Sequence, residues 1–228
     1  MIDWLPEDLP PNFPETHTAQ KDPNGLLAAG GLLTPPWLIK AYRQGIFPWF
    51  DDESPILWWS PAPRMVLKSK DFHISKSLKK LMRQHSTGPY KISCNQAFYD
   101  VISECSQPRY DDDGTWITGE MKEAYIRLNE NNICHSVECW DEEGNLVGGL
   151  YGLLIDRVFF GESMFNKANN ASKLSFAFFA DYLFSAGVEL IDCQMHSDHM
   201  ERFGAKEIER DDFERLLKSV GLSSGIKG

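Results

Sequence analysis

The sequence predicts an α+β fold in which a small, loop-rich N-terminal domain, residues 1–62, packs on a larger domain, residues 63–228. Residues 1–62 are rich in proline, glycine and tryptophan, whereas regular hydrophobic periodicity begins after Pro63. In the larger domain, three strand-like segments joined by tight turns precede one long apolar helix and a final strand. This order predicts an antiparallel meander covered by a helix.

The N-terminal domain has one clear helical pattern. Thr34 is a suitable N-cap and Pro35 suits the first turn, and Gly45 ends the pattern. The apolar residues between them recur at helical spacing, and they are Trp37, Leu38, Ala41 and Tyr42. The following stretch, IFPWFDDESPILWWSPAPR, contains too many prolines for a long helix or a central strand.

The larger domain begins with three predicted helices. The first starts at Ser75, the second runs from Asn95 to about Glu104, and Thr118 caps the third. Strands are predicted over 135–140, 146–153 and 157–164, joined by the turns DEEGN and Ile155–Asp156. Asn169 or Asn170 then caps a long apolar helix that ends at Gly187. A strand over 188–195 and a last helix near 211–220 complete the chain.

Composition and charge exclude several classes of protein. The 228 residues are 42% hydrophobic and 25% charged, as in an ordinary globular protein. Neither a membrane span nor a signal peptide is recognisable, so we expect a cytoplasmic protein. The five cysteines are odd in number and lack C-x-x-C spacing, which favours free thiols over a zinc site. Because the net charge is −10, any polyanionic partner requires a local basic patch.

Two polar pairs stand near the end of the chain. In the strand VELIDCQM, Asp192 and Gln194 share one face and Cys193 takes the other. The carboxylate and amide form either a structural pair or a site in which Asp192 orients Gln194, and Cys193 is a poor candidate nucleophile. His196 and His199 lie three residues apart, but no third ligand has a recognisable spacing, so we predict no metal site.

A carboxylate in an apolar setting is the third unusual feature. Glu162 lies within FFGESMF, and burying it costs several kcal/mol unless a partner compensates. In an ideal strand Phe160, Glu162 and Met164 share a face. The following helix presents Phe176, Phe179 and Leu183 at helical spacing, which core packing alone explains.

Basic and aromatic side chains suggest a nucleic-acid surface. Four cations form a stripe on the helix that starts at Ser75, and they are Lys76, Lys79, Lys80 and Arg83. Such stripes are commonly solvated, yet in an acidic chain this one is the best candidate for phosphate contact. The tryptophans at 49, 58, 59 and 116 lie in proline- or glycine-rich loops. Each is either a core residue or a platform on which a base stacks.

Several motifs occur together in a recognisable order. They are PNGLLAAGG, AYRQGIFPWF, ILWWSPAPR, GTWIT, HSVECW, LVGGLYG, FFGESMF, NNASK and LIDCQ. From about Pro23 to Phe213 the chain resembles the leucyl/phenylalanyl-tRNA–protein transferases. The resemblance implies transfer of leucine or phenylalanine, and less readily methionine, from aminoacyl-tRNA to the N-terminal arginine or lysine of a protein. The product would then be degraded by the N-end rule pathway.

The resemblance also implies a fold and a site. The larger domain would be a GNAT-type acyltransferase, without the glycine-rich turn that holds coenzyme A, since NKANNASK stands in its place. Asp192 and Gln194 would be the catalytic pair. The donor pocket would consist of Leu150, Glu162, Met164, Phe176, Phe179, Leu183 and Ile191. Trp49 and Trp116 would stack on the terminal adenosine, and the Lys76–Arg83 stripe would hold the acceptor stem.

The chemistry requires no cofactor, because an aminoacyl ester is already activated, so neither ATP nor a metal is expected. We expect Asp192 to orient the Gln194 amide, whose carbonyl oxygen accepts a hydrogen bond from the attacking amine. In an ideal strand Ile191 faces away from Asp192, so its place in the pocket requires a bulge or a splayed strand. Asp111, Asp112 and Asp113 are acidic candidates for the cationic acceptor. A coenzyme A-dependent N-acyltransferase and a non-enzymatic RNA-end-binding module are the alternatives.

Overall fold

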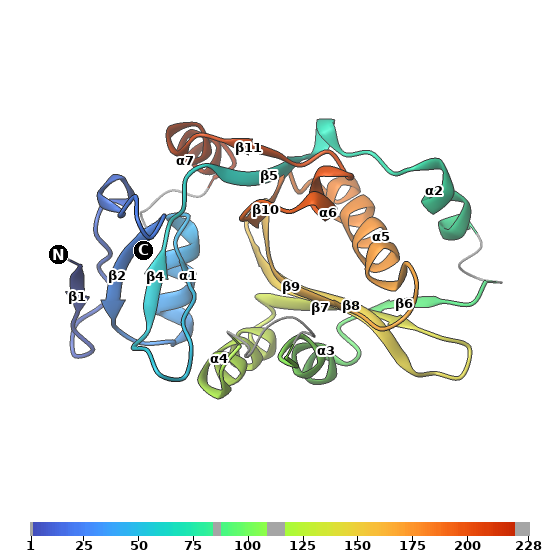
Figure 1. Ribbon diagram of the computed structural model, residues 1–228, viewed down its shortest axis with the longest axis horizontal. Coiled ribbons are helices and arrows are strands. Elements are labelled where there is room, and N and C mark those ends of the chain that lie inside the picture. Colours follow the sequence, from blue (N-terminus) through green and yellow to red (C-terminus); the bar gives the residue numbers. More distant parts are fainter. Residues whose placement is uncertain (1, 84–87, 109–116, 222–228) are drawn as a thin grey trace.

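Two β-sheets organise the residues that the computed structural model describes, which are 2–83, 88–108 and 117–221 (Figure 1). In the smaller sheet the strand order is β1-β2-β4-β3, with bounds Asp3–Leu5, Leu26–Gly30, Leu57–Trp59 and Phe47–Pro48. β1 pairs with β2 in parallel and the other pairs are antiparallel. Helix α1, Pro35–Arg43, packs beside this sheet (Figure 1). The prediction of one helix after Thr34 is therefore confirmed, while the short strands were not predicted.

The tryptophans of the small sheet divide into a core residue and a surface pair. Trp58 is fully buried and its indole N–H donates to the Gly30 carbonyl oxygen at 2.8 Å. Its ring contacts Phe13 and stacks with Trp37. The possibility that Trp58 is an exposed stacking platform is therefore wrong. Alternating strand geometry turns Trp58 inward and leaves Trp59 half-buried.

The larger sheet carries the rest of the described fold. Within the described residues its strand order is β11-β5-β10-β9-β8-β7-β6. The bounds in chain order are β5 Arg64–Lys68, β6 Lys91–Cys94, β7 Cys134–Trp140, β8 Leu146–Ile155, β9 Val158–Asn166, β10 Leu190–Gln194 and β11 Lys206–Ile208. β9 and β10 run parallel, and the other pairs are antiparallel. The predicted meander and the strand that follows the long helix are confirmed.

Helices cover both faces of this sheet. Figure 1 shows α5 on one face and α3 and α4 on the other, with α2 beside α5. Their bounds are α2 Lys76–Arg83, α3 Phe98–Cys105, α4 Gly119–Glu130 and α5 Ala171–Ser185. Thr118 caps α4 as predicted, since its hydroxyl oxygen accepts from the Met121 N–H at 3.2 Å. The helix expected at Asn95 starts three residues late, because Asn95 has a positive φ of 56° and bonds to Ser136.

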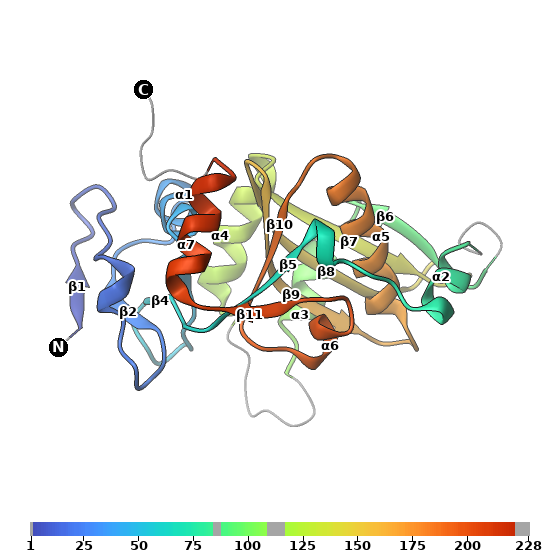
Figure 2. The ribbon, with the colours of Figure 1, turned by 90° about the horizontal axis from the view of Figure 1, so that it is seen from above.

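The C-terminal segment returns to the N-terminal sheet. A short helix α6, Asp198–Glu201, precedes β11, and α7, Arg210–Ser219, lies beside α1 (Figure 2). Gly45 permits this approach, because a Cβ there would lie 2.7 Å from the Phe213 ring. One hydrophobic cluster consequently runs from the N-terminal sheet through α7 and the α4 side of the large sheet. A second cluster lies between the large sheet and α5.

Bulges on β9 and β10 change which way their side chains point. Tyr151 pairs with Ser163 and Gly152 with Gly161, so Glu162 has no partner on β8. On β10, Asp192 pairs with Val66 and Gln194 with Met65, so Cys193 is the extra residue. A bulge reverses the alternation of side chains beyond it. Phe160 therefore packs in the first cluster and Met164 against the second, and the expectation that they share a face is wrong.

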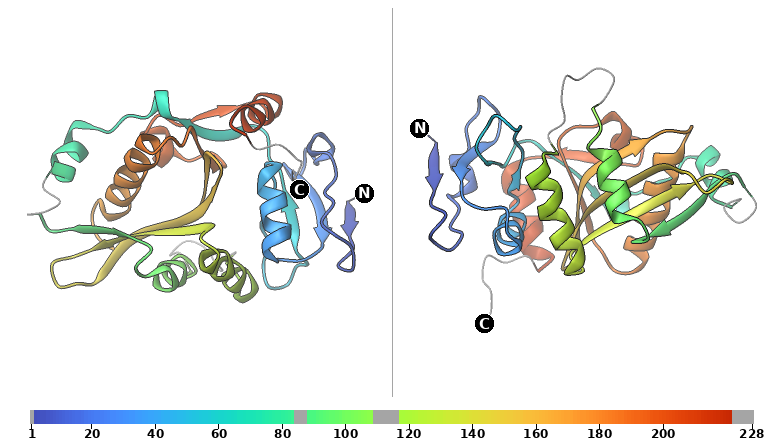
Figure 3. Two further views of the ribbon diagram at one scale, coloured as in Figure 1. Left: turned by 180° about the vertical axis from the view of Figure 1, so that it is seen from behind. Right: turned by 90° about the horizontal axis from the view of Figure 1, so that it is seen from below.

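No helix in the described ranges is long and apolar enough to cross a bilayer. Figure 3 shows the layered arrangement from behind and from below, with α5 and the α3–α4 pair on opposite sides of the large sheet.

Candidate active site

A buried ion pair lies beneath the β10 bulge. Arg64 donates from Nε to Oδ1 of Asp192 at 2.9 Å and from Nη2 to Oδ2 at 2.7 Å. The two side chains are 1% and 0% exposed. The guanidinium lies 4.8 Å from the ring centres of both Phe47 and Phe213. Asp192 is therefore held in place and shielded from any substrate.

Gln194 is oriented by two carboxylates through different parts of the residue. Its backbone N–H donates to Oδ1 of Asp192 at 2.9 Å, while its side-chain Nε2 donates to Oε1 of Glu162 at 2.8 Å. The backbone of Gln194 has a positive φ of 63°, which the bulge and the Asp192 contact maintain. The expected contact between the Asp192 carboxylate and the Gln194 side chain is thus wrong. Glu162 binds the amide instead, and this leaves the Gln194 carbonyl oxygen available.

Glu162 lies in a network of hydroxyl groups. Tyr42 contacts Oε1 at 2.7 Å and Tyr125 contacts Oε2 at 2.8 Å. The two phenol oxygens are themselves 2.6 Å apart. Tyr42 comes from α1, Tyr125 from α4 and Glu162 from the β9 bulge. The carboxylate for which the sequence offers no evident partner is therefore bound by side chains from α1 and α4.

The three oxygen–oxygen contacts in this network require three protons. Two tyrosine hydroxyls supply two, so an ionised Glu162 leaves one short contact without a hydrogen. A proton on Glu162 completes the ring. The geometry therefore favours the protonated carboxyl.

The electrostatics agree with this count. Burial raises the pKa of Glu162 from 4.5 to about 7, although the hydrogen bonds from Tyr42, Tyr125 and Gln194 act in the opposite direction. Burial and the neighbouring Glu162 also raise the pKa of Tyr42 and of Tyr125 well above 10. Glu162 can therefore exchange a proton near neutral pH, whereas the tyrosines stay protonated.

The predicted apolar pocket residues gather in one place. The core cluster between the large sheet and α5 contains Leu150, Phe176, Phe179, Leu183 and Ile191, and Met164 packs against it. Leu150 and Met164 are cross-strand neighbours on β8 and β9. Ile191 packs against this cluster on the α5 side of the sheet, while Asp192 binds Arg64. Glu162 differs from the others, since its carboxylate contacts Tyr42 and Tyr125.

The predicted nucleic-acid contacts lie at the surface where the structure describes them. Trp49 is 40% exposed, with its ring 5.3 Å from that of Trp59. The four cations of the α2 stripe are exposed, while Leu78 of the same helix is buried. Trp116 and the three aspartates at 111–113 fall outside the described residues.

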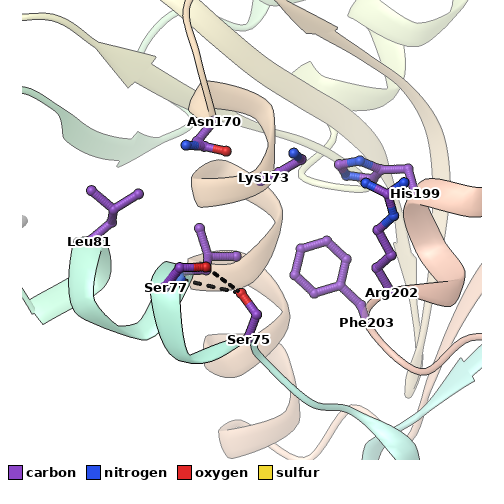
Figure 4. A pocket seen from close by; sticks show the side chains of 9 residues that line it. Ser75, Ser77, Leu81, Asn170, Lys173, His199, Arg202 and Phe203 are labelled. Carbon is purple, nitrogen blue, oxygen red and sulfur yellow. Dashed lines mark hydrogen bonds between the residues drawn. The ribbon is translucent and has the colours of Figure 1, made fainter.

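The other candidates have ordinary surroundings. Burial raises the pKa of the Cys193 thiol, which opposes a nucleophilic role. His196 lies at the surface and contacts Asp198 at 3.1 Å. With Glu201 these two form an exposed group of possible metal ligands, a common feature of acidic surfaces. His199 faces elsewhere, into a cavity beside α5 (Figure 4).

Sequence reasoning missed three residues of the network. Tyr42 and Tyr125 were interpreted only as apolar positions of helices, and Arg64 only as part of a motif. For Arg64 a signal existed, because a lone arginine directly before the buried strand MVL requires a buried anion. No local pattern indicates that the two tyrosine hydroxyls meet Glu162.

Comparison with known families gives two adjoining matches. The family model described as leucyl/phenylalanyl-tRNA protein transferase matches residues 66–218, and that of its N-terminal domain matches residues 31–62. Relatives that carry the name leucyl/phenylalanyl-tRNA–protein transferase match along nearly the whole chain. One from Saccharophagus degradans is 52% identical over 94% of this chain and 86% of its own. One from Pseudomonas fluorescens is 52% identical over 95% and 94%.

Solved structures give a weaker likeness. A GCN5-related N-acetyltransferase-like protein from Streptococcus suis 89/1591 aligns with a TM-score of 0.40 and 11% identity, covering 77% of this chain and 66% of that one. The α+β class is established by the strand order and registers of the molecule itself.

Proposed function

The chain belongs to the leucyl/phenylalanyl-tRNA–protein transferase family, and on this premise we propose that it moves leucine or phenylalanine from aminoacyl-tRNA to the N-terminus of a protein. The enzyme is an aminoacyltransferase. The favoured acceptors are proteins that begin with arginine or lysine, methionine is a poorer donor residue, and the product is marked for N-end rule degradation. The enzyme works in the cytoplasm, where charged tRNA is made and used.

The observation that carries the catalytic proposal is the orientation of Gln194. Glu162 accepts from its Nε2 and Asp192 fixes its backbone, so the carbonyl oxygen is directed away from both carboxylates. Gln194 is half-buried, whereas Asp192 is fully buried. Gln194 is thus the residue that contacts the attacking amine, and Asp192 and Glu162 position it.

The reaction is aminolysis of an ester. The nitrogen lone pair of the acceptor α-amine attacks the carbonyl carbon of the aminoacyl ester, so a C–N bond forms and the bond to the ribose oxygen breaks. The proton lost by nitrogen ends on that ribose oxygen. Holding amine and ester together can lower the barrier by about 7–11 kcal/mol, and a hydrogen bond from the amine to Gln194 fixes the direction of attack.

The donor side chain is proposed to lie against the apolar cluster of β8, β9 and α5. Met164 is its half-buried member, while Phe176 and Phe179 form the wall behind. A lining of this kind discriminates by shape, and a methylene group is worth about 1–3 kcal/mol. Leucine and phenylalanine are therefore preferred over β-branched valine, and methionine is used to a lesser extent.

The tRNA is proposed to bind at the exposed aromatic and basic groups. Trp49 stacks on the terminal adenosine together with Trp116, and the exposed cations of α2 contact the acceptor stem. We also propose residues 1–62 as the N-terminal domain and 63–228 as the catalytic one. Since Tyr42 and Phe47 contact Glu162 and Arg64 across this division, we expect the larger domain alone to be inactive.

A labelled transfer assay tests the function. The protein is mixed with radiolabelled Leu-tRNA and with peptides that begin with Arg, Lys or Ala, in the absence of ATP. Label is expected on the Arg and Lys peptides. Binding of tRNA without any transfer would instead support an RNA-end-binding module, and transfer from a coenzyme A thioester would support an ordinary N-acyltransferase.

A further inference from the structure

A cavity of about 300 Å³ lies between α2, α5 and the short helix α6, away from the Gln194 network. Lys173 of α5 and His199 and Arg202 at α6 gather on one side of it (Figure 4). None of the described residues that line the cavity is acidic. The whole chain has a net charge of −10, so this cavity, lined by basic side chains, differs in sign from the protein as a whole.

The remaining polar groups of the cavity suit an anion. Ser75 and Ser77 contribute hydroxyls 3.1 Å apart at the start of α2, and Asn170 is the N-cap residue of α5. Two helix N-termini, with their positive dipole ends, therefore border the same space, although the Leu78 N–H already donates to the Ser75 hydroxyl and the Ser172 N–H to Oδ1 of Asn166. Leu78 and Phe203 complete an apolar floor.

One buried atom of a residue that lines the cavity lacks a partner. Nε2 of His199 is shielded from solvent and has no hydrogen-bond partner among the described residues. Burial, Lys173 and Arg202 lower the pKa of His199, so neighbouring cations disfavour its charged form. A bound anion offsets the repulsion between Lys173, Arg202 and a protonated His199, and it accepts a hydrogen bond from the imidazole.

We propose that this cavity, which we call the α2–α5–α6 pocket, binds a phosphate group. The inference rests on the proposed function in one respect, since a backbone phosphate of the donor tRNA is the source that the neighbouring α2 stripe favours. Leu78 and the two serines face the pocket, while Lys76, Lys79, Lys80 and Arg83 are exposed on the same helix. A tRNA backbone that crosses α2 would contact the four cations first and the pocket next.

The first experiment measures tRNA affinity against salt. Lys173→Ala/Arg202→Ala is compared with Lys21→Ala/Arg127→Ala, which removes the same charge from exposed positions elsewhere. Each phosphate contact contributes about 0.9 to the slope of log affinity against log salt. The pocket variant is expected to lose about one contact, so between 50 and 200 mM salt its affinity falls about 3.5-fold less than that of the wild type. The control should keep the wild-type slope.

The second experiment identifies the source of the phosphate. The His199 imidazole signals are followed by NMR in the full chain while uncharged tRNA, inorganic phosphate or adenosine diphosphate is added. A rise in the pKa of His199 with tRNA, absent in the Lys173/Arg202 variant, supports a backbone phosphate. A rise with the small anions alone supports a free phosphate ligand. An unchanged His199 with all three, together with a wild-type salt slope, overturns the proposal. Because uncharged tRNA is used, this failure is independent of whether wild-type protein transfers label.

Discussion

Replacing Glu162 with glutamine tests the network at its centre. The side chain keeps its shape, and an amide with its oxygen at the position of Oε1 accepts from Tyr42 and from Nε2 of Gln194. Its NH₂ group, at the position of Oε2, then donates to Tyr125, whose hydroxyl donates to Tyr42. The variant therefore keeps the orientation of Gln194 but lacks the carboxylate, whose negative charge polarises the Gln194 amide and which can exchange a proton near neutral pH. We therefore expect Glu162→Gln to fold normally and to transfer poorly.

The effect on stability follows from the pKa of Glu162. Burial raises this pKa from 4.5 to about 7, which corresponds to about 3 kcal/mol at about 1.4 kcal/mol per pKa unit. Because the folded state binds the proton more tightly, this stabilisation is present below about pH 4.5 and is lost as the pH rises through about 7. Glutamine does not titrate. Between pH 4 and pH 8, the free energy of unfolding of the variant should therefore rise by up to about 3 kcal/mol relative to that of the wild type.

Urea unfolding at several pH values measures the stability difference, and the labelled transfer assay measures kcat/KM. We expect kcat/KM to fall by about 10²-fold or more, the lower end of what a positioned proton acceptor contributes. Glu138→Gln is the matched control, since Glu138 is also buried and bonded to the hydroxyls of Ser93 and Ser136. A stability difference independent of pH, or wild-type transfer by Glu162→Gln, would refute the reasoning.

Four further substitutions test other parts of the molecule. Arg64→Met leaves Asp192 buried without its partner and should cost about 3–5 kcal/mol in urea unfolding, whereas an exposed pair would lose less than about 1 kcal/mol. Tyr42→Phe removes one donor to Glu162, so the pKa of that carboxyl should rise in a ¹³C NMR titration, and an unchanged pKa would contradict the network. Trp49→Ala should weaken binding of the tRNA 3′ end by about 1–3 kcal/mol without loss of stability, while Trp58→Ala should destabilise the fold by about 3–5 kcal/mol.

Local patterns predicted the elements that local forces determine. The helix between Thr34 and Gly45, the cap at Thr118 and the meander of β7–β9 follow from caps, turns and periodicity in neighbouring residues. The apolar pocket residues of α5 also lie in one cluster, because helical spacing directs them to one face.

The parts that sequence reasoning missed depend on pairing between distant segments. Glu162 is the extra residue of β9 opposite β8, and Cys193 is the extra residue of β10 opposite β5. Each bulge depends on how two strands pair, which the sequence of one strand does not reveal. The bulges decide that Gln194 is bound by Glu162 rather than by the Asp192 side chain. Likewise β5, which directly precedes a long excursion of the chain, pairs with β10 more than a hundred residues later.

The position of Arg64 between Phe47 and Phe213 has a consequence for biosynthesis. Its aromatic neighbours come from two segments far apart in the sequence, before β4 and in α7, and its counterion belongs to the strand that carries Gln194. A nascent chain on the ribosome that has not yet emerged as far as α7 lacks one of these walls. We expect such a chain to leave charged tRNA untouched, so that the ability to consume a substrate of translation arises only after α7 has left the ribosome.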